Sequence, residues 1–65
     1  MRKIIGYDLK KDDYIGFKSI AEASRWIVDC NKSSNEKAAY SAIYRCCNRK
    51  IGSAYGYIWD YDKIA

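Results

Sequence analysis

The sequence contains no histidine and no proline, and only three of its 65 residues are cysteine. Without histidine it lacks the commonest general base and metal ligand of proteins. Cys30, Cys46 and Cys47 include no CxxC pair that would bind zinc, and an odd count with two adjacent members is a poor disulfide framework. We therefore expect no catalytic residues, no metal and no cofactor, and interpret the cysteines as small, partly buried apolar side chains in a reducing compartment.

Long apolar runs are also missing. The longest uncharged stretch, Ile51–Trp59, has nine residues, whereas a membrane span needs about 18 or more. Apolar residues make up 49% of the chain and charged residues 31%, which is typical of a globular protein. We expect one small domain over residues 1–65, located in the cytoplasm, with no membrane partner and no small-molecule substrate.

The net charge of +4 is concentrated in one short segment. Residues 32–50 carry five basic residues and one acidic residue, whereas residues 1–31 have a net charge of +1 and residues 51–65 of −1. Such a block is often only a solvated helix surface, but a focused positive field is also what a polyanionic partner requires.

Hydrophobic patterning predicts three strands. Alternation over residues 3–9 indicates the first, and a short charged connection leads to a second at residues 14–17. Residues 54–61 are rich in aromatic side chains at a period of two and indicate the third. Neither a hairpin nor two helices could bury enough surface alone, so we predict an α+β fold: a three-stranded antiparallel sheet with a helix pair packed on it, in the order β-β-α-α-β.

The two helices have similar start signals. Residues 19–22 and 33–36 both read Ser-x-x-Glu, the form of a capping box in which the serine and the glutamate accept each other's backbone N–H groups. They predict helices over about residues 20–29 and 36–49. Gly52 is well placed to stop the chain after the second helix.

One face of the second predicted helix is apolar, and the opposite face is basic and polar. The apolar stripe consists of Ala39, Ala42, Ile43 and Cys46. The opposite face, extended past the helix end, consists of Lys37, Tyr40, Ser41, Tyr44, Arg45, Asn48, Arg49 and Lys50. Apart from Glu36 at the helix start it includes no acidic residue, and it offers arginine for phosphate or guanine, asparagine for adenine, and hydroxyl groups for phosphate. We interpret these eight residues as a candidate DNA-binding site on a helix-turn-helix. In the alternative reading, the two tyrosines pack against the sheet and the basic residues only suit the helix dipole.

Four segments, read together, resemble a known DNA-binding module. They are Tyr7-Asp8, the stretch from Phe17 to Arg25 that reads F-K-S-I-A-E-A-S-R, Ile43 with Cys46, and residues 54–61, which read A-Y-G-Y-I-W-D-Y. The pattern is similar to that of the intron-encoded nuclease repeat module (NUMOD1) of homing endonucleases, over about residues 3–61. In that family, helix-turn-helix modules accompany HNH or GIY-YIG nuclease domains, many of them in phages.

The resemblance implies that the first helix and the closing strand are architectural and that the second helix contacts duplex DNA. The connection at residues 29–34 is longer and more polar than the family's short turn. No nuclease domain accompanies the module in this sequence. The resemblance therefore implies a free-standing, non-catalytic protein of a phage or mobile element that acts in the host cytoplasm.

Two other functions stay open at this stage. The ten aromatic residues exceed the need of so small a core, and tyrosine and tryptophan are favoured at interfaces, which fits a viral effector of a host polymerase, protease or ATPase subunit. A metal-dependent nuclease is the third reading. Tyr14-Ile15-Gly16 echoes part of the GIY-YIG motif, with Tyr7, Arg25 and Glu36 as candidate active-site residues. However, the first triplet of that motif is scrambled, and 65 residues fall short of such a domain.

Overall fold

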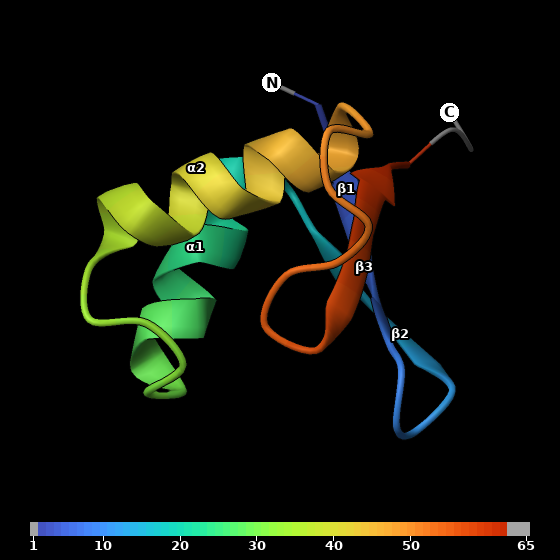
Figure 1. Cartoon of the computed structure of the whole chain (residues 1–65), viewed down its shortest axis with the longest axis horizontal. Helices are drawn as coiled ribbons and strands as arrows, with labels where there is room; N and C mark the ends of the chain where they lie inside the picture. Colours follow the sequence, from blue (N-terminus) through green and yellow to red (C-terminus); the bar gives the residue numbers. More distant parts are fainter. Residues whose placement is uncertain (1, 63–65) are drawn as a thin grey trace.

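Five elements follow one another along residues 2–62, the part of the chain that the computed structural model describes. They are β1 (Ile4–Asp8), β2 (Asp13–Phe17), α1 (Ile20–Asp29), α2 (Glu36–Cys47) and β3 (Tyr57–Tyr61) (Figure 1). This order and the three-stranded antiparallel sheet confirm the predicted α+β fold. No helix within the described residues is long and apolar enough to cross a membrane.

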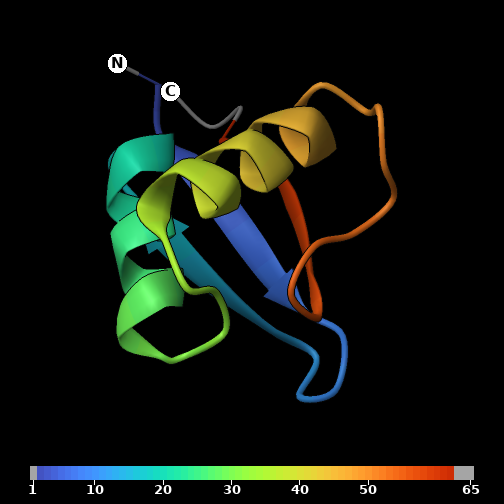
Figure 2. The same ribbon diagram turned by 60° about the vertical axis from the view of Figure 1, so that its left-hand side comes forward.

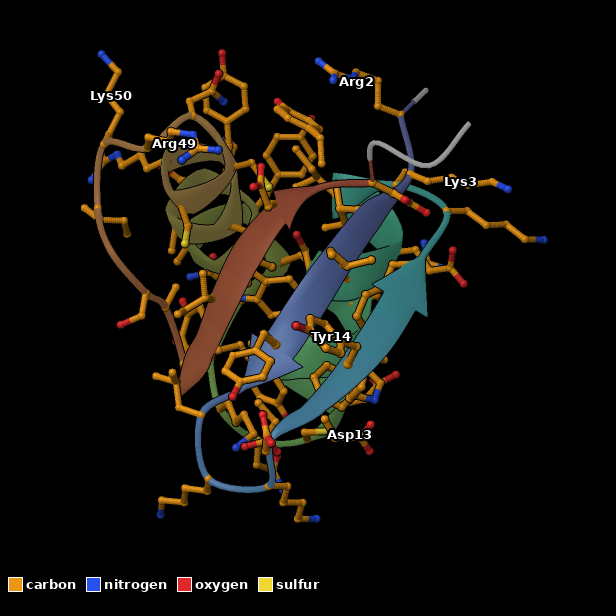
Figure 3. All side chains as sticks on the ribbon, turned by 90° about the vertical axis from the view of Figure 1, so that its right-hand side faces the viewer. Arg2, Lys3, Asp13, Tyr14, Arg49 and Lys50 are labelled. Atoms are coloured by element: carbon orange, nitrogen blue, oxygen red, sulfur yellow. The ribbon has the colours of Figure 1, made fainter. Side chains whose placement is uncertain are left out.

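The sheet has the strand order β2-β1-β3, with β1 antiparallel to both neighbours. Directly opposed residues share a face, so Gly6, Ile15 and Trp59 form one row across the sheet. Both helices cover the inner face, to which this row belongs (Figure 2). The outer face carries Tyr14 and is covered by neither helix (Figure 3).

The third strand is shorter than predicted. It begins at Tyr57 rather than near residue 54, because Tyr55 and Gly56 have positive φ angles of 57° and 82°. These two residues form a turn closed by reciprocal hydrogen bonds between Ala54 and Tyr57, with N···O distances of 2.9 and 3.0 Å. The chain therefore reverses direction immediately before β3.

The core lies between the inner face of the sheet and the two helices. Its fully or nearly buried members are Ile4, Ile20, Ala23, Ile27, Ala39, Ile43, Cys46, Cys47, Tyr57 and Trp59. Trp59 is 1% exposed, and its indole N–H donates to the Ala54 carbonyl at 3.0 Å. Burial of Cys46 and Cys47 agrees with the sequence interpretation, but Cys30 is exposed because it caps the C-terminal end of α1.

Helix α1 begins as predicted. The Ser19 hydroxyl accepts from the Glu22 N–H at 3.2 Å, although the Glu22 carboxylate accepts from the Lys18 N–H, at 3.0 Å, rather than from Ser19. The helix ends at Asp29, and Asn31, which follows the C-cap Cys30, has a positive φ of 60°. Asparagine tolerates this left-handed conformation better than most residues, which makes it a suitable stop.

Helix α2 begins at a different cap from the predicted one. Its N-cap is Asn35, whose side-chain oxygen accepts from the Ala38 N–H at 2.7 Å. The Ser33 hydroxyl instead donates to the Asn35 carbonyl at 3.1 Å, outside the helix. Both residues are capable caps, but only Asn35 directly precedes the first helical residue.

Substituting alanine at these two positions tests this assignment. Asn35→Ala is expected to lower the free energy of unfolding by about 1 kcal/mol, because an N–H of the first turn loses its acceptor. Ser33→Ala is the matched control and is expected to change it by less than about 0.5 kcal/mol. Urea denaturation followed by circular dichroism measures both values. A larger loss for Ser33→Ala would contradict the assignment.

Helix α2 ends earlier than predicted, and Gly52 does not end it. Arg49 has a positive φ of 61°, and its N–H donates to the Cys46 carbonyl at 3.1 Å. The Lys50 N–H donates to the Arg45 carbonyl at 2.8 Å. This pair of bonds is a Schellman motif, which satisfies the last carbonyls of the helix. The two basic residues at 49 and 50 are therefore held against the helix end.

Candidate nucleic-acid interface

All eight residues of the predicted DNA-binding site are exposed to solvent. They are Lys37, Tyr40, Ser41, Tyr44, Arg45, Asn48, Arg49 and Lys50. Tyr40 is 45% exposed and Tyr44 50%, so neither is packed beneath the sheet. The part of the alternative reading in which these tyrosines pack against the sheet is therefore wrong.

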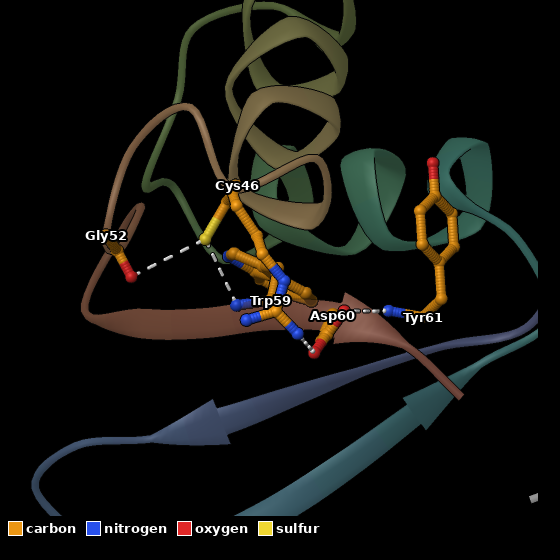
Figure 4. Close-up of polar contacts among 6 residues, drawn as sticks. Cys46, Gly52, Trp59, Asp60 and Tyr61 are labelled. Carbon is orange, nitrogen blue, oxygen red and sulfur yellow. Dashed lines mark hydrogen bonds and ion pairs between the residues drawn. The ribbon is translucent and has the colours of Figure 1, made fainter. Parts of the chain in front are cut away.

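The orientation of α2 is fixed by the side chains on its opposite face. Ala39, Ile43 and Cys46 are buried against the rest of the molecule, as the sequence predicts, and Ala42 lies at the edge of this stripe. The Cys46 thiol contacts both β3 and the loop before it. Its sulfur accepts from the backbone N–H of Trp59 at 3.3 Å, and its S–H donates to the Gly52 carbonyl at 3.7 Å (Figure 4). Because the apolar stripe of α2 is anchored in this way, the opposite, basic face of the helix points outward.

The cations on this face differ in their partners. Among residues 2–62, the ion pairs are Arg25–Glu36 at 3.5 Å and Arg49–Asp60 at 3.4 Å, so Lys37, Arg45 and Lys50 form no ion pair there. The Arg49–Asp60 pair is partly exposed, and such pairs contribute only about 0–1 kcal/mol (Figure 4). A phosphate group can therefore replace Asp60 as the partner of Arg49 at little cost.

Asn48 has a structural use that the sequence does not reveal. It is the C-cap of α2, and its side-chain amide donates to the Tyr44 carbonyl at 2.8 Å and to the Tyr61 hydroxyl at 3.3 Å. Both amide protons are therefore engaged within the protein. Asn48 positions Tyr61 instead of offering a free amide for adenine.

Sequence analysis missed Arg2 as a member of this region. Its guanidinium carbon lies 3.9 Å from the centre of the Tyr61 ring. Arg2 and Lys3 lie at the same end of the molecule as Arg49 and Lys50, away from Asp13 (Figure 3). Arg2 reaches this region because Ile4 pairs with Tyr61, which brings the basic residues before β1 to the end of β3. We call Arg2, Lys37, Arg45, Arg49 and Lys50 the basic surface.

The buried thiol beneath this surface stays neutral at pH 7. Burial raises the pKa of Cys47 to about 11. Cys46 and Asp60 raise this pKa to a smaller extent, and Arg2 lowers it. Since the thiolate is absent at neutral pH, Cys47 adds no negative charge near the basic surface.

The residues of the nuclease reading are not brought together. Tyr7 lies on the outer face of the sheet, where its hydroxyl donates to the Asp12 carboxylate, and this bond raises the pKa of the phenol. Arg25 and Glu36 pair with each other on the helices, which cover the inner face. Among residues 2–62, no three cysteine, aspartate or glutamate side chains form a group that could hold a metal ion.

The dimensions of α2 are those of an ordinary α-helix. Twelve residues make a helix about 18 Å long, and an α-helix fits in a groove about 12 Å wide. Cations and hydroxyl groups follow one another along its exposed face, where they can meet phosphates and base edges.

A comparison of the chain with models of protein families, with curated proteins and with solved structures finds no match in any of the three.

Proposed function

We propose that this protein is a non-catalytic DNA-binding module that places α2 in the major groove of duplex DNA. The observation that carries the proposal is the exposed face of α2 and the residues just after it: Lys37, Arg45 and Lys50 form no ion pair among residues 2–62. A solvated face without a partner usually mixes acidic and basic residues. The sequence resemblance to the intron-encoded nuclease repeat module, and with it an origin in a phage or mobile element, supports the same function independently.

The side chains of the interface divide into two groups by position. Ser41, Tyr44 and Arg45 lie on the exposed face of the helix itself, where they reach base edges or adjacent phosphates. The other cations contact phosphates and set the position of the helix in the groove. They are Lys37 in the first turn of α2, Arg49 and Lys50 after its last turn, and Arg2 before β1.

The salt dependence of binding tests this proposal. Neutralising four or five phosphates releases counterions, so the logarithm of the association constant should fall against the logarithm of salt concentration with a slope of about −4. Fluorescence anisotropy titrations of a labelled duplex at several salt concentrations measure this slope. A slope near zero would contradict binding through the basic surface.

A protein partner is the second candidate, and the outer face of the sheet favours it. Tyr14 is 64% exposed and Ile58 42%, and Tyr7 lies between them in the same row of the sheet. Exposed apolar and aromatic side chains that lie together are typical of protein interfaces. These side chains carry no charge, so binding of a host protein through them would depend only weakly on salt.

A further inference from the structure

A hollow of about 260 Å³ lies beside the basic surface. Its lining comes from the start of α1, the exposed face of α2, the segment before β1 and the end of β3. The residues that line it are Arg2, Ser19, Ile20, Ala21, Tyr40, Tyr44 and Tyr61. Three aromatic rings and one guanidinium group therefore surround a space with no acidic side chain in its lining.

Two of these rings serve no aromatic contact within the fold. Among residues 2–62, the ring pairs join Tyr7 to Tyr14 and link the four core aromatics, and neither Tyr40 nor Tyr44 takes part in any of them. Both rings are about half exposed. Helical spacing of four residues places them next to each other along α2. About half of each tyrosine is therefore accessible to a ligand.

The third ring is held in place before any ligand arrives. The Tyr61 hydroxyl accepts from the Asn48 amide at 3.3 Å, and Arg2 lies over the ring with its guanidinium carbon 3.9 Å from the ring centre. A guanidinium group stacked on one ring can stack a second planar group on its other side. A wall that is already ordered loses little conformational entropy on binding.

We propose that this hollow takes one unpaired nucleobase of the nucleic acid whose phosphates lie on the basic surface. Every base has a π face, and tyrosine rings and arginine planes are the side chains on which unpaired bases stack. The hollow, at about 260 Å³, has room for a single ring system. The phosphates on either side of the base would meet Arg2 and Arg45. The inference rests on the proposed function and makes it more specific: the preferred target is a duplex with an unpaired nucleotide.

Two labelled duplexes test the inference. One is fully paired, and the other has the same sequence with a single extra thymidine that has no partner. Stacking on an aromatic side chain is typically strong enough to tighten binding about tenfold, so the duplex with the extra base should have a dissociation constant about ten times lower. Anisotropy titrations at one fixed salt concentration measure both constants.

Substitutions locate the preference in the hollow. Tyr40→Leu and Tyr44→Leu keep an apolar side chain on the helix but remove the ring, so each should lower the ratio of the two constants severalfold. Tyr40→Phe and Tyr44→Phe keep the ring and should keep the ratio, which separates stacking from hydrogen bonding by the hydroxyl. Tyr14→Leu changes an exposed tyrosine on the outer face of the sheet and is the matched control.

The outcomes distinguish this inference from the proposed function. Equal affinity of the unmodified protein for both duplexes would overturn the inference and leave duplex binding intact. A tenfold preference that survives both leucine substitutions would also overturn it, because the base would then lie elsewhere. Failure to bind either duplex would overturn the proposed function itself. Circular dichroism of each variant confirms that the fold is retained before binding is measured.

Discussion

Replacing Gly6 by alanine should lower the free energy of unfolding by about 1–3 kcal/mol, although it adds only one methyl group. A Cβ atom at Gly6 would lie 2.7 Å from Cζ3 of Trp59 and 3.0 Å from Cε3, closer than carbon atoms approach. The indole ring is 1% exposed and bonded to Ala54, so it has no open space to move into. A protein of 65 residues has a total stability of about 3–10 kcal/mol, so this change removes a large part of it.

Gly16→Ala is the matched control for this prediction. Gly16 lies on the outer face of the same sheet, and no heavy atom lies within 4 Å of its added Cβ. Neither glycine has a positive φ, so the effect of alanine on the unfolded chain is the same at both positions. We expect Gly16→Ala to change stability by less than about 0.5 kcal/mol. Urea denaturation followed by tryptophan fluorescence compares the two, and equal stabilities would contradict close packing of Trp59 on Gly6.

The order of the elements could be predicted because each is marked locally. Ser19 and Glu22 stand before an apolar period of 3.6 residues, and the aromatic alternation before Tyr61 is typical of a strand. The N-cap and the C-terminal end of α2 differ from the prediction because the sequence offers two adequate local signals for each. Ser33 and Asn35 are both good N-caps, and the chain uses Asn35, which accepts from the Ala38 N–H. Gly52 is the better left-handed residue, yet Arg49 adopts that conformation because it directly follows Asn48, the C-cap of α2.

The exposed face of α2 was also predictable, since helical spacing alone separates it from the buried stripe. The hydrogen-bond and ion-pair partners of the residues on this face could not be predicted from the sequence. Asn48 bonds to Tyr61 and Arg49 pairs with Asp60, each more than ten positions away along the chain. Such contacts depend on how α2 lies against β3, which no local pattern specifies. For the same reason, the position of Arg2 beside this face becomes evident only from the pairing of β1 with β3.

The choice of residues for a charge-reversal test follows from these contacts. Arg49 is unsuitable, because a glutamate there would face Asp60 and would also alter the residue that ends α2. Lys37 and Arg45 are suitable, since both are exposed and neither forms an ion pair among residues 2–62. Their replacement therefore changes the charge of the surface without removing a contact that holds the fold.

The double variant Lys37→Glu/Arg45→Glu should bind duplex DNA about 100-fold more weakly than the unmodified protein at low salt. Each lost cation that contacts DNA is expected to weaken binding about tenfold and to reduce the steepness of the salt dependence by about one. Anisotropy titrations at several salt concentrations measure both effects on the same duplex. Circular dichroism checks that α2 is intact, because a glutamate at position 45 is slightly unfavourable near a helix C-terminus.

Lys10→Glu/Lys11→Glu is the control with the same change in net charge. These exposed lysines lie in the turn between β1 and β2, at the opposite end of the molecule from Arg2 and Lys50 (Figures 1 and 3). If binding depends on a specific surface, this variant should lose only the few-fold affinity that follows from lower net charge. Equal losses in the two double variants would mean that total charge, rather than the face of α2, determines binding, and the proposed placement of the helix would then be wrong.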